Sequence, residues 1–292
     1  MITTNRTGGK TTFFGRLFVK KFIEKREKFA LLFRFNYELE NVEEKFFKDI
    51  GSLFFRGYTM TSKKISGGIG RELFLHSPNC DEDDLGESCG YAIALNQSDQ
   101  VKKNSHLFSD VQRIMFDEFQ SESNNYCHDE ITKFQSVHTS IARGQGKQTR
   151  YVPVYMLSNP VSLINPYYVE FGISERLQDK TKFLKGHGWV LENGWVESAS
   201  KAMLDSGFSR AFASSKYVNF ASQQGVYLND NSSFIEKPTG SSKYLATIIY
   251  NNKEYALKEY FKEGIIYCDD RDDSTFSFRI AVTTDDHRIN YV

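Results

Sequence analysis

Two adjacent carboxylates, Asp117 and Glu118, close an apolar run that spans residues 113–119 and reads Arg-Ile-Met-Phe-Asp-Glu-Phe. A continuous apolar run predicts a strand buried on both faces, as in a parallel sheet covered by helices. Because two acids cannot stay unpaired in such a core, we expect them at the strand's carboxyl edge, where open α/β sheets bind ligands. One acid could hold a metal ion there while the next orients a nucleophile, which is the hydrolytic half of an ATPase site.

A phosphate-binding loop is predicted near the start of the chain, where Gly9-Lys10-Thr11 matches the second half of the pattern G-x-x-x-x-G-K-[ST]. Backbone N–H groups could surround phosphate oxygens, Lys10 could reach the β- and γ-phosphates, and Thr11 could hold Mg²⁺. Thr4 stands where the pattern has its first glycine, so a chance Gly-Gly-Lys-Thr turn is the alternative. Residues 13–27 are predicted to form the helix that faces the phosphates, and the strand before the loop is barely visible.

A third polar position follows the apolar strand predicted over 151–157, which ends in Ser158-Asn159. Asn159 could bond a γ-phosphate or the attacking water, and the alternative is an asparagine that caps the next turn. Further elements are expected around these positions: a buried strand over 29–35, a helix over 37–50, a small antiparallel excursion at the sheet's edge over 57–95, and a helix over 129–142 that stops before Arg143-Gly144.

The composition is that of a globular protein with a sizeable core, since 40% of the 292 residues are hydrophobic and 25% are charged. Lys+Arg and Asp+Glu both number 37, which argues against a polybasic mode of binding but leaves local nucleic-acid contact open. None of the four cysteines forms a CxxC pair, so zinc and redox motifs are unsupported. Without a signal peptide or an apolar run of roughly 18 residues, we expect a soluble, intracellular protein.

A second unit is predicted beyond residues 214–233, whose Ser, Asn and Gln content is typical of a linker. Residues 198–213 before it look helical, and three strand-like runs after it, 243–250, 254–260 and 264–269, predict a β-meander. Clustered carboxylates in this unit could hold two metal ions for phosphodiester cleavage. Solvated turns are the interpretation we favour for these acids, which are Asp269, Asp270, Asp272, Asp273, Asp285 and Asp286.

In the order and spacing of these stretches, the chain resembles the phi29-like DNA encapsidation ATPases, the genome-packaging motors of small tailed bacteriophages, which are related to terminase large subunits. Residues 113–119 are similar to the family's Walker B strand. Residues 157–168, Leu-Ser-Asn-Pro-Val-Ser-Leu-Ile-Asn-Pro-Tyr-Tyr, are similar to its coupling motif and the segment that follows. Residues 234–237, 249–251 and 283–286 resemble parts of its C-terminal domain, so the resemblance covers nearly the whole chain.

The resemblance implies an α/β fold, namely an additional-strand, RecA- and terminase-like P-loop NTPase sheet with helices on both faces. A smaller C-terminal α+β domain would be RNase H-like and a vestigial nuclease. The implied domains are an ATPase domain over 1–198, a lid or linker over 199–230, and a DNA-gripping domain over 231–292. Compared with the family, we expect the lead into the first strand and the helical tail after Val292 to be missing.

The resemblance also implies roles for single residues. Thr11 and Asp117 would hold Mg²⁺, Glu118 would polarise the attacking water, and Asn159 would sense the γ-phosphate. Arg143 falls where the family places an arginine finger that reaches the ATP of the neighbouring subunit. Lys103 aligns, after one insertion, near a lysine proposed to act between subunits. The ATP-binding loop would comprise Arg6, Thr7, Gly8, Gly9, Lys10, Thr11 and Thr12.

The predicted function is therefore a Mg²⁺-dependent ATPase that translocates double-stranded DNA into a procapsid. The implied partners are the portal or connector and further copies of the chain in a ring, expected to be a pentamer, with a packaging RNA as a further candidate and no membrane. Its place would be the host cytoplasm, transiently attached to the procapsid. Two alternatives stay open: a terminase large subunit with an active metal-dependent endonuclease, and a decayed fragment that acts as a structural or binding subunit.

Overall fold

The computed structural model describes residues 1–79, 85–144, 146, 148–178, 181–222, 226–229, 238–250, 253–282 and 286. The chain divides into two compact units, Met1–Asp230 and Asn231–Val292. The similar stretches 234–237 and 283–285, residue 251 and the acid Asp285 lie outside the described residues. Within the described ranges, no helix is long and apolar enough to cross a membrane.

The first unit is built on a nine-stranded mixed sheet with the order β3-β4-β5-β2-β6-β7-β1-β9-β8. Its central strands, from β5 to β9 in that order, are all parallel, so they all end at one edge. Antiparallel strands flank them on both sides. The strand bounds are β1 (Ile2–Thr3), β2 (Lys28–Phe33), β3 (Thr59–Lys64), β4 (Gly70–His76), β5 (Glu87–Ala94), β6 (Val111–Asp117), β7 (Val154–Ser158), β8 (Phe183–Gly186) and β9 (Trp189–Asn193).

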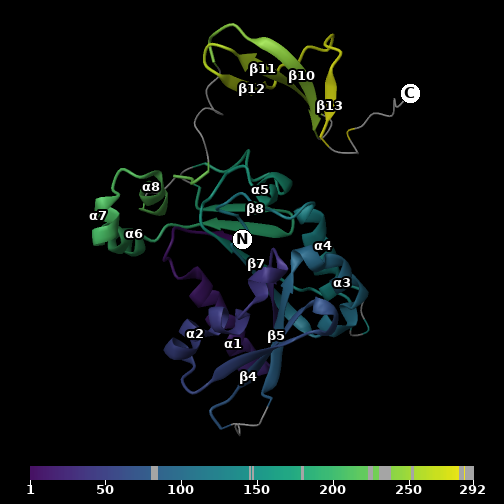
Figure 1. Cartoon of the computed structure of the whole chain (residues 1–292). Helices are drawn as coiled ribbons and strands as arrows, with labels where there is room; N and C mark the ends of the chain where they lie inside the picture. The colour runs from purple at the N-terminus through teal and green to yellow at the C-terminus, as the bar shows by residue number, and fades with distance from the viewer. Residues whose placement is uncertain are drawn as a thin grey trace. The chain divides into compact units, whose positions relative to one another are not determined.

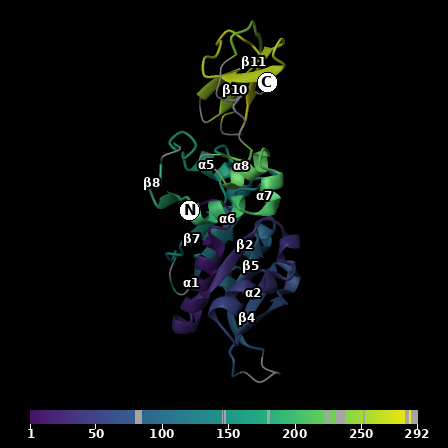
Figure 2. The same cartoon turned by 90° about the vertical axis from the view of Figure 1, so that its left-hand side faces the viewer.

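Helices cover both faces of this sheet (Figure 1). One face carries α1 (Lys10–Lys25) and α2 (Val42–Phe54), which face the viewer in Figure 2. The other carries α3 (Ser98–Lys103), α4 (Glu130–Ile141) and α5 (Pro166–Glu170). Successive residues of a strand point to opposite faces, so the apolar run of β2 supplies Leu31 to the core under α1 and Leu32 to the core under α4.

Close packing of α1 on α2 depends on Gly15. A Cβ atom added there would lie 2.3 Å from Cδ1 of Ile50. Contacts this short essentially never occur, so a side chain at this position would force the Ile50 side chain to move. Glycine at this position therefore lets α1 pack closely on α2.

Two local expectations differ from the structure, and a third, the barely visible first strand, agrees with it. The helix expected over 37–50 is split into a 3-10 turn at Asn36–Leu39 and α2, because Asn41 between them is left-handed at φ 52°. The excursion expected at the edge over 57–95 is wrong in part, since β5 lies inside the sheet, parallel to β2. Strand β1 has only two residues and pairs with β7 on one side and β9 on the other. Its extended conformation therefore depends on these two neighbours and not on its own sequence.

Three short helices close the first unit: α6 (Glu197–Leu204), α7 (Gly207–Ala211) and α8 (Lys216–Ser222). The helical stretch expected over 198–213 breaks at Ser206, whose hydroxyl accepts a hydrogen bond of 3.1 Å from the Ser209 backbone N–H and caps α7. The polar stretch 214–233 contains α8, so part of it is helical although its composition is typical of a linker.

The second unit is a four-stranded sheet with the order β12-β11-β10-β13. The three strand-like runs form β10 (Lys243–Tyr250), β11 (Lys253–Tyr260) and β12 (Ile265–Asp269), which pair antiparallel as predicted. Strand β13 (Arg279–Ala281) returns to the far side of β10 and runs parallel to it.

Candidate functional site

The loop between β1 and α1 is anchored to the strands beside it. The Thr4 backbone N–H donates to the Ser158 carbonyl at 3.2 Å. The side chain of the fully buried Asn5 accepts from the Val196 N–H at 2.9 Å and donates to the Val196 carbonyl at 3.0 Å. The loop is thus held at the carboxyl edge by the end of β7 and by the segment that follows β9.

The backbone of this loop has the shape that an anion site needs. Thr7 (φ 61°) and Gly9 (φ 75°) are both left-handed, and alternating backbone conformations of this kind turn successive N–H groups into a concave, anion-binding nest. The substitution of threonine for the first glycine does not disrupt this shape, because the Thr4 side chain is buried. A Cβ atom added to Gly8 would lie 2.8 Å from the Thr4 hydroxyl, so Thr4 occupies the space behind a loop glycine.

Two hydrogen bonds join this loop to the ends of β6 and β7. Lys10 Nζ donates to Asn159 Oδ1 at 2.7 Å, and Thr11 Oγ1 donates to Asp117 Oδ2 at 2.7 Å. Burial lowers the pKa of Lys10 and raises the pKa of Asp117, because each group loses water around its charge. Residues from three separate segments therefore meet in one partly desolvated cluster.

Glu122 joins this cluster, although the sequence analysis missed it. Its carboxylate accepts two bonds from Arg6 Nη2, at 2.6 and 2.7 Å, and one from Asn159 Nδ2 at 3.2 Å. The guanidinium of Arg6 also lies over the Tyr217 ring of α8, 5.3 Å from its centroid. A signal existed in the sequence, since Glu122 is a third acid only four residues after Glu118.

Glu118 lies beyond the end of β6 with its side chain exposed and its backbone left-handed at φ 56°. For a residue other than glycine, this conformation costs about 1–3 kcal/mol and needs support from its surroundings. Partial desolvation by the surrounding residues, together with the neighbouring charge of Asp117, raises the pKa of Glu118. The backbone thus directs a carboxylate with raised proton affinity away from the sheet.

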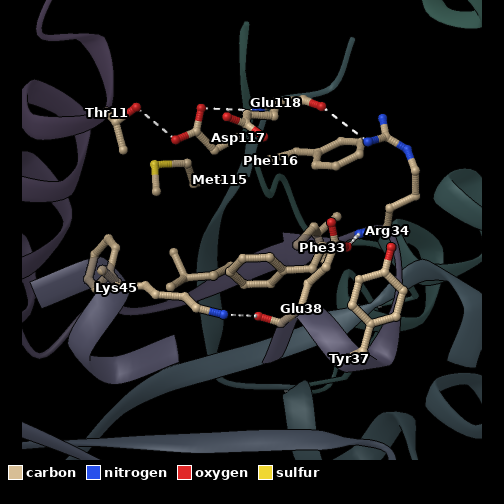
Figure 3. A pocket seen from close by; sticks show the side chains of 13 residues that line it. Thr11, Phe33, Arg34, Tyr37, Glu38, Lys45, Met115, Phe116, Asp117 and Glu118 are labelled. Carbon is tan, nitrogen blue, oxygen red and sulfur yellow. Dashed lines mark hydrogen bonds between the residues drawn. The ribbon is translucent and has the colours of Figure 1, made fainter. Parts of the chain in front are cut away.

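A cavity of about 380 Å³ opens beside these acids (Figure 3). Thr11, Asp117 and Glu118 lie along one side of it, Tyr37 and Glu38 lie on the opposite side, and the guanidinium of Arg34 lies beside Glu118. A second cavity, of about 300 Å³, continues from the first to Arg6 and Glu122. The residues that line both cavities are Arg34, Tyr37, Glu38 and Glu118. Together they form a cleft along the carboxyl edge, beside the loop between β1 and α1.

A magnesium ion fits the donor set at this edge. Mg²⁺ keeps several waters and usually takes one or two carboxylates together with substrate phosphates. The Thr11 hydroxyl and the Asp117 carboxylate, 2.7 Å apart, offer such a partial shell. In the described part of the chain, no group of three or more His, Cys, Asp or Glu side chains could hold a metal by itself. A metal here would therefore need the oxygens of a bound phosphate.

The two residues expected to act between subunits are not part of this cluster. Arg143 follows α4 and is exposed. The end of α4 lies beside the amino end of β6, because Arg150 donates to the carbonyls of both Ile141 and Val111. Arg143 is therefore about one strand length, roughly 20 Å, from Asp117 at the other end of β6. Lys103 is exposed at the end of α3.

The other loop residues lie where the pattern places them. Thr7, Gly8 and Gly9 form the turn before α1, and Thr12 lies in its first helical turn. Beyond Glu122, sequence reasoning also missed Arg34, which follows the apolar strand β2 just as Asp117 closes β6. The same logic of a polar residue at a strand's carboxyl end could have found it.

Comparisons with known proteins point to one family. The model of the podovirus DNA encapsidation protein (Gp16) family matches residues 1–292. The DNA packaging protein of Bacillus phage phi29 is 25% identical over 275 residues, which cover 92% of this chain and 74% of the relative. The DNA packaging protein of Bacillus phage B103 is 26% identical over 271 residues, covering 92% and 76%.

Solved structures agree in fold. A chain of the bacteriophage phi29 viral genome packaging motor assembly aligns with a TM-score of 0.58 and 22% identity, covering 98% of this chain and 81% of that one. The crystal structure of the N-terminal domain of the DNA packaging ATPase from phi29 aligns with a TM-score of 0.51 and 23% identity, covering 66% of this chain and 90% of that one.

Proposed function

The chain belongs to the podovirus DNA encapsidation protein family, and we propose that it is an ATP-hydrolysing motor that moves double-stranded viral DNA into a procapsid. One observation carries the proposal: Lys10, Thr11, Asp117 and Asn159 meet at one sheet edge. Strand β7, which leads to Asn159, lies between the loop strand β1 and the acid strand β6. This order supports the additional-strand class of P-loop ATPase.

In the proposed mechanism, the loop over 6–12 binds the phosphates through its backbone N–H groups and Lys10. Thr11 and Asp117 would hold Mg²⁺, which neutralises phosphate charge when bound. Glu118 orients the attacking water and accepts its proton. Asn159, which contacts Lys10, responds when the γ-phosphate leaves, because the two side chains share one hydrogen bond.

The proposed site is completed by a second copy of the chain. Arg143 is exposed and lies at the wrong end of β6 to serve its own Asp117. An arginine supplied by the neighbour in a ring would stabilise the charge of the transition state. Such a ring, proposed to be a pentamer, would dock on the portal of the procapsid in the host cytoplasm, with a packaging RNA as an optional adaptor. Lys103 is a second exposed candidate for this interface.

Residues 199–230 are proposed as a lid on the ATPase domain, which spans 1–198. Two contacts support this role. The ring of Tyr217 lies against Arg6 of the loop, and Asn229 Nδ2 donates to the backbone carbonyl of Glu122, the acid that pairs with Arg6, at 3.1 Å. A change at Arg6 on ATP binding would therefore reach α8 directly.

Double-stranded DNA is expected to stimulate ATP hydrolysis by the purified chain, and removal of Mg²⁺ with EDTA is expected to stop it. The physical reason is that Thr11 and Asp117 can offer only a partial metal shell, so phosphate charge is poorly neutralised without the ion. Phosphate release at several DNA and Mg²⁺ concentrations measures both effects. A chain that hydrolyses no ATP under any of these conditions would instead be a structural or binding subunit.

The second unit, residues 231–292, is proposed to be an RNase H-like domain that grips DNA. Three antiparallel strands followed by a fourth that runs parallel to the first support this assignment. An active nuclease would need several carboxylates around two metal ions. Strand β10 carries no carboxylate, and the buried Asp269 already forms an ion pair of 2.9 Å with Lys258.

No cleavage of supercoiled plasmid is therefore expected with either Mg²⁺ or Mn²⁺. Two-metal hydrolysis requires acids that converge, and within the residues that the structure describes no such group of three exists. A nicking assay with a known endonuclease as positive control measures this. Metal-dependent nicking that disappears in Asp269→Asn would favour the terminase with an active nuclease.

A further inference from the structure

Arg34 lies directly after β2, at the same sheet edge as Asp117 and Glu118, and only 6% of it is exposed. A buried guanidinium needs a partner that balances its charge. Glu130, the first residue of α4 and 4% exposed, accepts bonds from Arg34 Nε at 3.0 and 2.8 Å. Burial alone would lower the pKa of Arg34, but the hydrogen bond and charge of Glu130 outweigh it and raise the pKa.

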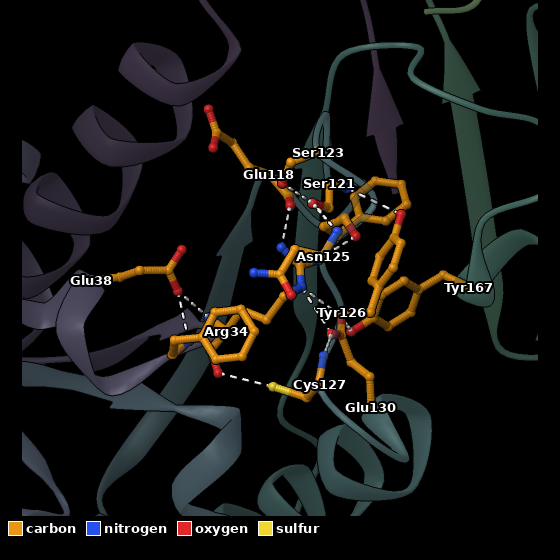
Figure 4. A network of polar contacts seen from close by, with 12 residues as sticks. Arg34, Glu38, Glu118, Ser121, Ser123, Asn125, Tyr126, Cys127, Glu130 and Tyr167 are labelled. Carbon is orange, nitrogen blue, oxygen red and sulfur yellow. Dashed lines mark hydrogen bonds and ion pairs between the residues drawn. The ribbon is translucent and has the colours of Figure 1, made fainter. Parts of the chain in front are cut away.

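The other two nitrogens of Arg34 bond to the backbone of the acidic turn. Nη1 donates to the Glu118 carbonyl at 3.2 Å, and Nη2 donates to the Phe119 carbonyl at 2.7 Å. Figure 4 shows the guanidinium between the Glu118 backbone and Glu130. One planar group thus holds two consecutive carbonyls at and just after the left-handed residue, and a conformation of this kind persists only where the surroundings support it.

The carboxylate of Glu118 is left free by this arrangement. A direct ion pair with Arg34 would hold the side chain and lower its basicity, whereas bonds to the carbonyls fix the backbone and so the direction of the Cα–Cβ bond. Orientation without neutralisation is what a group that accepts a proton from water requires.

Glu130 is itself held from two further directions. The hydroxyl of the fully buried Tyr167 donates to Glu130 Oε1 at 2.7 Å, and the Cys127 backbone N–H donates to Oε2 at 2.8 Å. Tyr167 belongs to α5, which follows the segment that contains Asn159. The position of Arg34 is therefore tied both to the acidic turn and to the chain after β7.

We propose that Arg34, locked by Glu130, is a positioning residue that holds Glu118 in the conformation needed for hydrolysis. The inference rests on the proposed role of Glu118. A purely structural ion pair would change the stability of the fold and leave the turnover of folded protein unchanged. A positioning role lowers turnover in protein that is folded and still binds ATP.

Arg34→Lys is the first test, because lysine keeps the charge but its single ammonium cannot hold both carbonyls and both Glu130 oxygens. We expect kcat to fall about 100-fold, as small misplacements of reacting groups do, while the Kd for ATP stays within about twofold. Arg150→Lys is the matched control. Arg150 is also buried and donates to two backbone carbonyls, at the opposite end of β6, and its variant should keep the wild-type kcat.

The double variant Arg34→Met/Glu130→Met decides the matter if Arg34→Lys does not fold. Replacing both partners of a buried ion pair leaves no unpaired charge and is often tolerated. We expect folded protein that binds ATP with the same loss of kcat. Wild-type kcat in either folded variant overturns the inference. If Glu118→Gln itself turns over normally, the proposed role of Glu118 fails, whereas a wild-type chain that hydrolyses no ATP overturns the proposed function, so these failures are distinguishable.

Discussion

Glu118→Gln is expected to abolish ATP turnover while ATP binding is retained. Glutamine has the size and shape of glutamate, so the left-handed turn and the contacts of Arg34 with its carbonyls should survive. What is lost is the ability to accept a proton from the attacking water, which contributes about 10²–10⁴-fold to rate in typical enzymes. The phosphate loop and the Thr11–Asp117 pair are untouched, so affinity for the nucleotide should not fall.

Single-turnover hydrolysis and equilibrium binding of ATP separate these effects. Glu40→Gln is the matched control, because Glu40 is an exposed carboxylate near the same edge that lines neither of the two cavities. It removes the same charge and should keep the wild-type rate. If Glu118→Gln hydrolyses ATP at the rate of this control, Glu118 does not activate the water.

Arg143→Ala is expected to silence homo-oligomers, with a loss of about 10³–10⁵ in rate if it acts as arginine fingers do. The physical argument is distance. Within one chain, Arg143 lies near the amino end of β6 and Asp117 at its carboxyl end, so Arg143 could reach the charge developing on a phosphate at Lys10 only in a neighbouring subunit.

Mixing with Lys10→Ala subunits should restore activity. The Lys10→Ala subunit cannot bind phosphate but still offers an intact Arg143 to the next subunit. In an equal random mixture, about a quarter of the sites in a head-to-tail ring would combine an intact loop with an intact finger. Arg56→Ala, which removes another exposed arginine, should behave as wild type. A mixture that stays silent although mixed oligomers form would rule out a role between subunits.

Several features of the site could be predicted from short stretches. Asp117 and Glu118 follow an apolar run, and a run of that kind must end where acids can reach solvent or a ligand. The spacing of a phosphate loop predicts Lys10 and Thr11, and the place of Asn159 after an apolar strand predicts that it lies near them, as the hydrogen bond between Lys10 and Asn159 shows. The similarity of residues 157–168 led to the family, which the family model confirms over 1–292.

Other features depend on partners far away in the chain. Arg34 and Glu130 are 96 residues apart, and Arg6 and Glu122 are 116 residues apart. A lone arginine or glutamate carries no local pattern that reveals such a partner. Strand β1 is similar, because two residues have no periodicity and exist as a strand only through β7 and β9.

By itself, the sequence determined which segments are apolar and which polar residues end them, because periodicity and turn chemistry act over a few neighbouring residues. The tertiary structure alone decided that β7 lies between β1 and β6, that β5 is a central strand, and that the backbone of Glu118 rests on Arg34. Strand order and buried ion pairs are set by the simultaneous packing of distant segments around one core, and no window of the chain contains that information. The acids at the end of β6 and the arginine after β2 were visible locally, whereas the contact between Arg34 and the backbone of Glu118 was not.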